Sequence, residues 1–307
     1  SSGCRDKSPA PEHVVRAASS EDQWREEYFQ FAANNLQRLE EFGGDKILQE
    51  IIDRLNQWIR TQQLPPDWTP DPLVAAIAGP LAEVPGVRSL DKLEFLRPDG
   101  EALQEAVWLR DISHWARGKR LDDIQRAKQL FDWVVRNIQL EPDAAAEPPK
   151  IPNRPWETLL FGRGTATDRA WVFVLLARQQ KIDAVVLALP DEAAASDAEL
   201  KTWAVGVLHD GKLHVFDPAL GLPIPGPDGP TFDEQGLLDI RPATLDQLAQ
   251  DDALLRRLDL DEEHRYPVRA EQLSGVVAMI EGSPAYLSAR MQLVESHLVG
   301  EQRVILT

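Results

Sequence analysis

The residues with the clearest chemical arrangement lie between Gly162 and Asp217. A glycine loop over 162–164 precedes Asp168 and an apolar run, which predicts a helix that is buried on nearly all sides. The dipole at the start of such a helix lowers the pKa of a thiol and favours a thiolate nucleophile. Acyl transfer by a nucleophile also requires a base and an acid that orients it, and strands after the helix are suited to carry both.

Three strands are expected after this helix, over 184–189, 202–208 and 213–216. The dipeptide Asp210-Gly211 predicts a tight hairpin between the second and third strands. Strict alternation along the second strand gives one shared face to Trp203, Val205 and Val207. These elements must position any reactive groups around the start of the helix.

The stretch resembles the transglutaminase-like, papain-related superfamily over about residues 120–221, roughly a third of the chain. The matching features are the helix start G-x-x-x-D-x-A from Gly164 to Ala170, the strand with Trp203, and the F-D-P sequence that contains Asp217. The resemblance implies an α+β fold in which a central helix packs on a small antiparallel sheet, with helical N- and C-terminal extensions.

In this superfamily a cysteine, a histidine and an aspartate form the catalytic triad. Carried over by position, the resemblance places the nucleophile at Ala166, the base at Lys201 and the orienting acid at Asp217. An alanine methyl cannot attack a carbonyl carbon, and an exposed lysine is protonated near pH 7. We therefore expect a catalytically inactive domain that serves in binding or as a scaffold. Its residual cleft is expected around Gly164, Thr165, Thr167, Asp168 and Trp203.

Two alternatives stay open. A hydrolase or acyltransferase with a rebuilt site would use Thr165 or Thr167 as its nucleophile and His209 or His214 as its base. The same threonines equally fit helix capping, and the histidines fit ordinary strand and turn positions. The second alternative is a structural subunit of a larger assembly.

The flanking sequence predicts mainly helices. In the N-terminal region, 20–119, apolar residues recur at helical spacing in three segments, and the following core region, 120–225, opens with a further helix at 121–138. The region 226–307 is expected to be mainly helical, including a pair over 272–280 and 288–298. We expect residues 20–307 to pack as one unit behind a disordered tether at 1–19.

Composition narrows the range of partners. The 307 residues carry a formal net charge of −17, which disfavours nucleic acids and anionic membrane surfaces. The acidic stretch 251–263 matches no EF-hand loop, and no cofactor motif occurs, so we expect neither a metal nor a cofactor. A protein or peptide partner of unknown identity is the expectation that remains.

Cys4 is the single cysteine, which excludes an intramolecular disulfide. Its context, Ser-Ser-Gly-Cys followed by a polar stretch, resembles the processed end of a bacterial lipoprotein, in which Cys4 would carry lipid. This interpretation predicts an extracytoplasmic protein that meets the membrane only through that lipid. If Ser-Ser-Gly is instead an added leader, Cys4 is an ordinary residue and a cytoplasmic location is expected.

Overall fold

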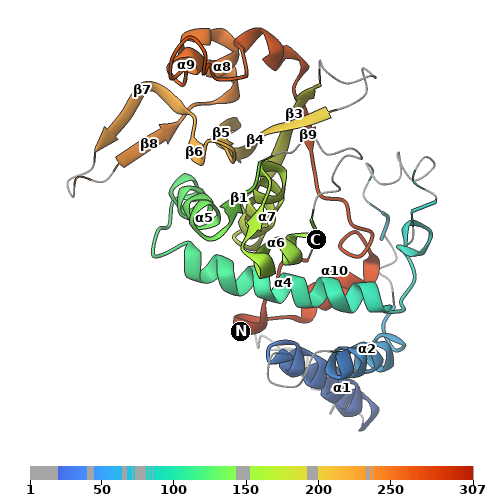
Figure 1. The fold of residues 1–307 in the computed structure, drawn as a ribbon. Helices are drawn as coiled ribbons and strands as arrows, with labels where there is room; N and C mark the ends of the chain where they lie inside the picture. The colour runs from blue at the N-terminus through green and yellow to red at the C-terminus, as the bar shows by residue number, and fades with distance from the viewer. Residues whose placement is uncertain are drawn as a thin grey trace, which may run out of the picture.

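The chain folds as an α+β protein (Figure 1). The computed structural model describes residues 20–39, 45–63, 68–70, 72, 81, 83–84, 86–142, 153–191, 200–232, 236 and 238–306. Cys4 and the expected tether at 1–19 lie outside the described residues. Among the described residues, no helix is long and apolar enough to cross a membrane.

The described residues of the N-terminal part are mainly helical. Helices α1 (Ser20–Leu36) and α2 (Asp45–Ile59) pack against each other, and α4 (Arg97–Ala116) lies across them after the short 3₁₀ helix η2 (Val87–Ser89). In α2 the apolar residues recur every three or four positions, so one stripe is buried. That stripe consists of Ile47, Leu48, Ile51, Ile52, Leu55, Trp58 and Ile59.

Three helices and a minimal parallel pair of strands form the helical side of the central region. They are α5 (Asp123–Asn137), α6 (Pro155–Phe161) and α7 (Ala166–Gln179), with β1 (Gln139–Leu140) beside β2 (Arg163–Gly164). Helix α7 is buried on nearly all sides, which confirms the sequence prediction, and it packs against α4, α5 and the sheet.

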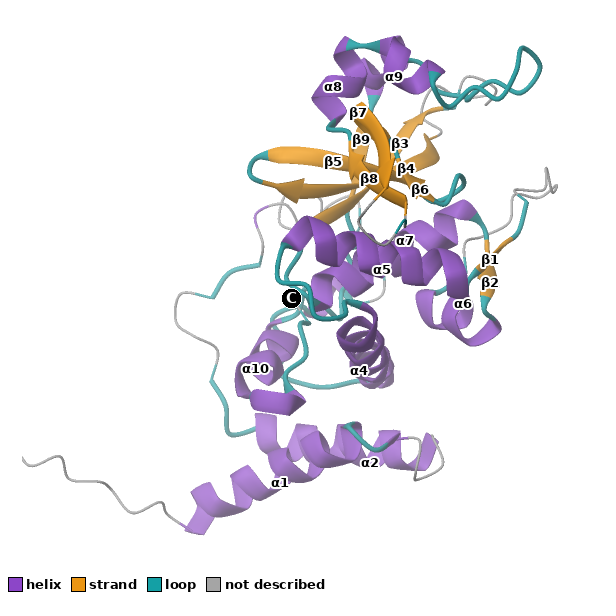
Figure 2. Cartoon of the chain, turned by 90° about the vertical axis from the view of Figure 1, so that its left-hand side faces the viewer, coloured by secondary structure: helices purple, strands orange, loops and turns teal. Residues whose placement is uncertain are grey.

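The main sheet has five antiparallel strands in the order β6-β5-β4-β3-β9. The predicted strands are β3 (Ala184–Pro190), β4 (Leu200–His209) and β5 (Lys212–Asp217), and the hairpin turns at Asp210-Gly211. The edges are β6 (Leu222–Pro223) and β9 (Val277–Met279). Figure 2 shows α5 and α7 on one face of this sheet and α8 and α9 on the other.

The predicted alternation of side chains along β4 is wrong at Trp203. The register shifts opposite Leu187 and Ala188, which pair with Ala204 and Thr202, so Trp203 is an extra residue in a bulge. Val205 and Val207 face α7, whereas Trp203 joins the apolar cluster on the opposite face. The bulge therefore separates Trp203 from the side of the sheet that meets α7.

The C-terminal part contains more strand than the sequence indicated. A hairpin of β7 (Pro225–Phe232) and β8 (Leu238–Pro242) precedes α8 (Leu245–Gln250) and α9 (Asp252–Arg256). The helical pair expected over 272–280 and 288–298 is wrong in its first member. Residues 272–275 of the first segment belong to the 3₁₀ helix η3 (Ala270–Gly275). Residues 277–279 form β9, because they pair with β3. Only the second is an α-helix, α10 (Ala289–His297), followed by η4 (Gly300–Gln302).

Candidate functional site

Thr165 and Asp168 form a closed capping box at the start of α7. Asp168 N donates to Thr165 Oγ1 at 3.2 Å, while Thr165 N and Oγ1 donate to Asp168 Oδ2 at 2.8 and 3.0 Å. The Asn153 backbone N donates to Asp168 Oδ1 at 2.8 Å, and the Asn153 side-chain Nδ2 donates to Asp168 Oδ2 at 3.3 Å. Thus the Thr165 hydroxyl both donates and accepts a hydrogen bond at the start of α7.

Gly164 lies so close to this box that a side chain would collide with it. A Cβ built at Gly164 would lie 2.7 Å from Asp168 Cβ and 3.0 Å from its Oδ2. Glycine is therefore required four residues before Asp168, which explains the spacing G-x-x-x-D in physical terms.

Replacing Thr165 with valine is expected to lower the free energy of unfolding by about 1 kcal/mol, because the N-cap acceptor for Asp168 N is lost. Thr167→Val is the matched control, since Thr167 lies in the same turn, is half-buried and is not the cap; its change should stay within about 0.5 kcal/mol. Urea denaturation followed by circular dichroism measures both values. Equal losses in the two variants would contradict the capping role.

The Asp217 carboxyl group, which stands at the expected acid position, is buried, and both of its oxygens accept hydrogen bonds. Its Oδ1 accepts from Ala219 N and Leu220 N at 2.8 and 2.9 Å, and its Oδ2 accepts from the Tyr266 hydroxyl at 2.6 Å. Burial raises the pKa of Asp217, and the three hydrogen bonds oppose that rise. Tyr266 thus occupies one of the two carboxylate oxygens.

Trp203 extends this network instead of lining a cleft beside α7. Its indole Nε1 donates to the Tyr266 hydroxyl at 2.7 Å. Trp203, Tyr266 and Asp217 therefore form a chain in which the indole and the phenol donate in sequence toward the carboxylate. Burial raises the pKa of Tyr266 well above its usual value, so the phenol stays protonated as the donor.

The remaining predicted positions are dispersed. Lys201 is exposed near the beginning of β4, and Ala166 is half-buried as the first residue of α7. The rings of His209 and His214 lie 6.3 Å apart, near the turn of the β4–β5 hairpin. His214 Nδ1 lies 3.4 Å from Pro242 O, and burial lowers its pKa. The structure thus brings Gly164, Thr165 and Asp168 together and leaves Trp203 outside that group.

Arg169 is a positioning residue that the sequence did not single out. Its buried guanidinium donates to the carbonyl oxygens of Val135, Ile138 and Pro218, which joins α7 to the end of α5 and to the residue after Asp217. An arginine in a helix that is otherwise apolar all round was the available signal, since a buried charge requires such partners.

The class that these features define is an α+β core in which a capped central helix packs against an antiparallel sheet. Residues 110–218 match the sequence model of the Transglutaminase-like superfamily. The central region is therefore a transglutaminase-like domain, as the resemblance implied. No curated protein matches the chain.

Two solved structures show partial similarity. A candidate protease from Parabacteroides distasonis is 18% identical, with a TM-score of 0.31 over 37% of this chain and 23% of its own length. A candidate cysteine protease from Cytophaga hutchinsonii is 12% identical, with a TM-score of 0.31 over 57% of this chain and 58% of its own. The chain therefore spans less than two thirds of either protein.

Proposed function

We propose that the chain is a catalytically inactive transglutaminase-like protein that binds a protein or peptide partner or serves as a scaffold. The observation that carries this proposal is the methyl group of Ala166 at the first position of α7, where the resemblance places the nucleophile. A helix dipole cannot activate a side chain that has no ionisable atom.

The arrangement around Asp217 supports the same proposal. An orienting acid acts by accepting a hydrogen bond from the base. Here Oδ2 accepts from Tyr266, and Oδ1 accepts from two backbone amides. These contacts use both oxygens of the carboxyl group to hold the polypeptide together, so a base on β4 would have to compete with them to be oriented.

The proposal is tested by assaying the purified chain for peptide hydrolysis, ester hydrolysis and incorporation of an amine into a glutamine-containing peptide. The expected rates equal those of the blank, while an active cysteine transglutaminase gives product in the same mixtures. Turnover above the blank would contradict the proposal. Its loss in folded Thr165→Val or His214→Ala protein would identify the rebuilt threonine site.

The two alternative functions receive less support. As a nucleophile, Thr165 would have to leave the capping box, because its hydroxyl already donates to Asp168 and accepts from the Asp168 backbone amide. A structural subunit would migrate in native extract at the mass of an assembly rather than of a single chain. Lipid attachment at Cys4 and an extracytoplasmic location also belong to the proposal, and they rest on the Ser-Ser-Gly-Cys context.

A further inference from the structure

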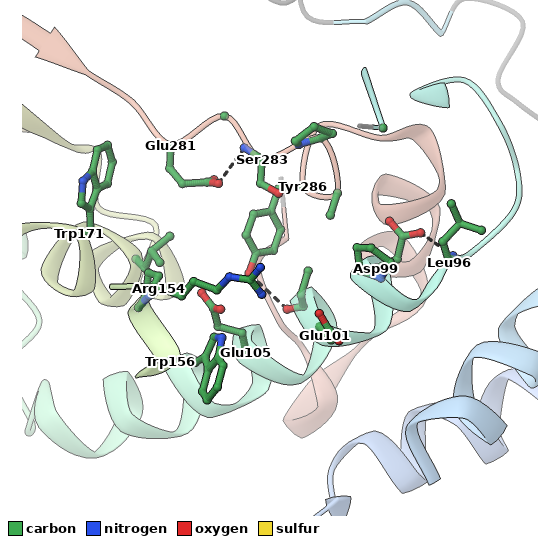
Figure 3. A pocket seen from close by; sticks show the side chains of 18 of the residues that line it. Leu96, Asp99, Glu101, Glu105, Arg154, Trp156, Trp171, Glu281, Ser283 and Tyr286 are labelled. Atoms are coloured by element: carbon green, nitrogen blue, oxygen red, sulfur yellow. Dashed lines mark hydrogen bonds between the residues drawn. The ribbon is translucent and has the colours of Figure 1, made fainter. Parts of the chain in front are cut away.

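A cavity of about 700 Å³ lies apart from the Asp217 network, where four parts of the chain meet. Its walls come from α4, the start of α6, the middle of α7 and the segment 280–286 (Figure 3). A volume of this size suits a small molecule or the side chain of a bound peptide. None of the residues that the resemblance assigned to the triad lines it.

Aromatic rings form part of the cavity wall. Trp156 comes from α6, Trp171 from α7, and Tyr286 from the segment before α10. Tyr286 is fixed, because its hydroxyl donates to Ala102 O at 3.2 Å and its ring lies 5.3 Å from the Arg178 guanidinium. Rigid rings of this kind offer electron-rich faces to a cation.

Glu105 is the carboxylate in the cavity wall that forms no direct ion pair with the described side chains, although Arg154, which also lines the cavity, and Arg178 act to lower its pKa. The other acids are paired: Glu281 with Arg178 at 3.0 Å, and two further residues on α4 with arginines of their own. In Figure 3 the side chain of Glu105 lies between the rings of Trp156 and Tyr286, and the side chain of Arg154 extends past it toward Tyr286. The cavity therefore combines aromatic faces with one half-buried acid that has no direct ion pair among the described side chains.

We propose that this cavity binds an organic cation, an ammonium or guanidinium group on an aliphatic stem, with the Glu105 carboxylate as its counter-ion. The stem would contact the rings and the charged group would reach the carboxylate. A net charge of −17 favours the approach of cations over the whole surface. The inference is independent of whether the start of α7 is catalytic.

The cation–carboxylate pair gives the proposal a pH dependence. Burial and the nearby Glu281 raise the pKa of Glu105 to about 7, although Arg154 and Arg178 oppose the rise. Arg154 is exposed, so solvent screens its charge, and Arg178 is held by Glu281. Because the ionised form of Glu105 binds the cation, affinity should rise about tenfold between pH 6 and pH 8.

The test uses the full chain and two probes of nearly equal shape, Nα-acetyl-argininamide and its neutral citrulline analogue. Isothermal titration calorimetry at pH 8 should show millimolar or tighter binding of the arginine probe and at least tenfold weaker binding of the citrulline probe. Indole NMR signals, assigned with Trp156→Phe and Trp171→Phe variants, should shift on titration. Acetyl-lysinamide and butylamine distinguish a peptide side chain from a free amine as the source of the cation.

Glu105→Gln should weaken binding of the arginine probe at least tenfold at pH 8 and abolish the pH dependence. Glu101→Gln is the matched control, because Glu101 also lines the cavity but pairs with Arg97, and its effect should stay below twofold. Unchanged melting curves would confirm that both variants are folded. Absence of binding at millimolar probe, equal binding of the citrulline analogue, or equal losses in both variants would overturn the proposal.

Discussion

Replacing Arg290 with methionine is expected to lower the free energy of unfolding by about 3–5 kcal/mol. The Arg290 side chain is buried, and its Nη2 donates to Asp99 Oδ1 at 2.8 Å while Nη1 donates to Ser89 O at 2.8 Å. Asp99 is only 1% exposed. Removing the guanidinium would therefore leave a carboxylate in the interior without its counter-charge, and that desolvated charge is the main source of the loss.

Urea denaturation monitored by tryptophan fluorescence measures this loss. The double variant Arg290→Met with Asp99→Asn should recover part of it, because no charge is then stranded. Arg97→Met is the control: that arginine pairs with Asp45 and Glu101 at the exposed surface, so its loss should be much smaller than that of Arg290→Met. A loss below 1 kcal/mol in Arg290→Met would contradict the importance of the buried pair.

The second large effect is expected for Tyr266→Phe, at about 1–3 kcal/mol near neutral pH. This change removes the donor to Asp217 Oδ2 and the acceptor of the Trp203 indole in one step. We expect a loss in the upper part of this range, because the acceptor left without its donor is the buried Asp217 carboxylate. The same loss should loosen the segment that follows α9 from the sheet.

The cost of Tyr266→Phe should depend on pH. Burial raises the pKa of Asp217 in the folded state, so its protonated form favours folding; this contribution is complete below the unfolded pKa and is lost as pH rises through the folded pKa. The Tyr266 hydrogen bond lowers the pKa, which means that it favours the ionised form. Tyr266→Phe should consequently cost more at pH 8 than at pH 4.

Unfolding free energies of the wild-type and variant proteins at several pH values test this dependence. Ser113→Ala is a suitable control, because the Ser113 hydroxyl donates to Leu176 O and accepts from Gln180 in a buried network without a carboxylate. Its cost should be nearly constant with pH. A Tyr266→Phe cost that is equally constant would show that the phenol does not stabilise ionised Asp217.

Local physical chemistry made the central region predictable. The glycine, the N-cap threonine and the acid three residues later define the start of α7 within a few neighbouring positions. The Asp-Gly turn likewise defines the β4–β5 hairpin, because it relates residues that are close in sequence. These signals sufficed for the α+β class and for the placement of Ala166 and Asp217 on their elements.

The rest depends on contacts between distant parts of the chain. The bulge at Trp203 is set by the register of β4 against β3. The hydroxyl group that donates to Asp217 belongs to Tyr266, which lies 49 residues later. The residues 277–279 become a strand because the edge of β3 is available to them. Glu105 and Trp171 belong to different helices, so no spacing in the sequence indicates that they share a cavity.

The core of the N-terminal helices has a consequence for how the chain is synthesised. Its buried residues come from α1, α2 and α4, and also from Met291, Val294, Val304 and Leu306. Helices α1 and α2 emerge from the ribosome well before these four residues are synthesised. The apolar stripe of α2 therefore stays incompletely covered until then. Proteins with such separated contacts fold late in synthesis and expose apolar surface meanwhile. The nascent chain is therefore expected to depend on chaperones that shield α1 and α2 until residues 291–306 have been synthesised.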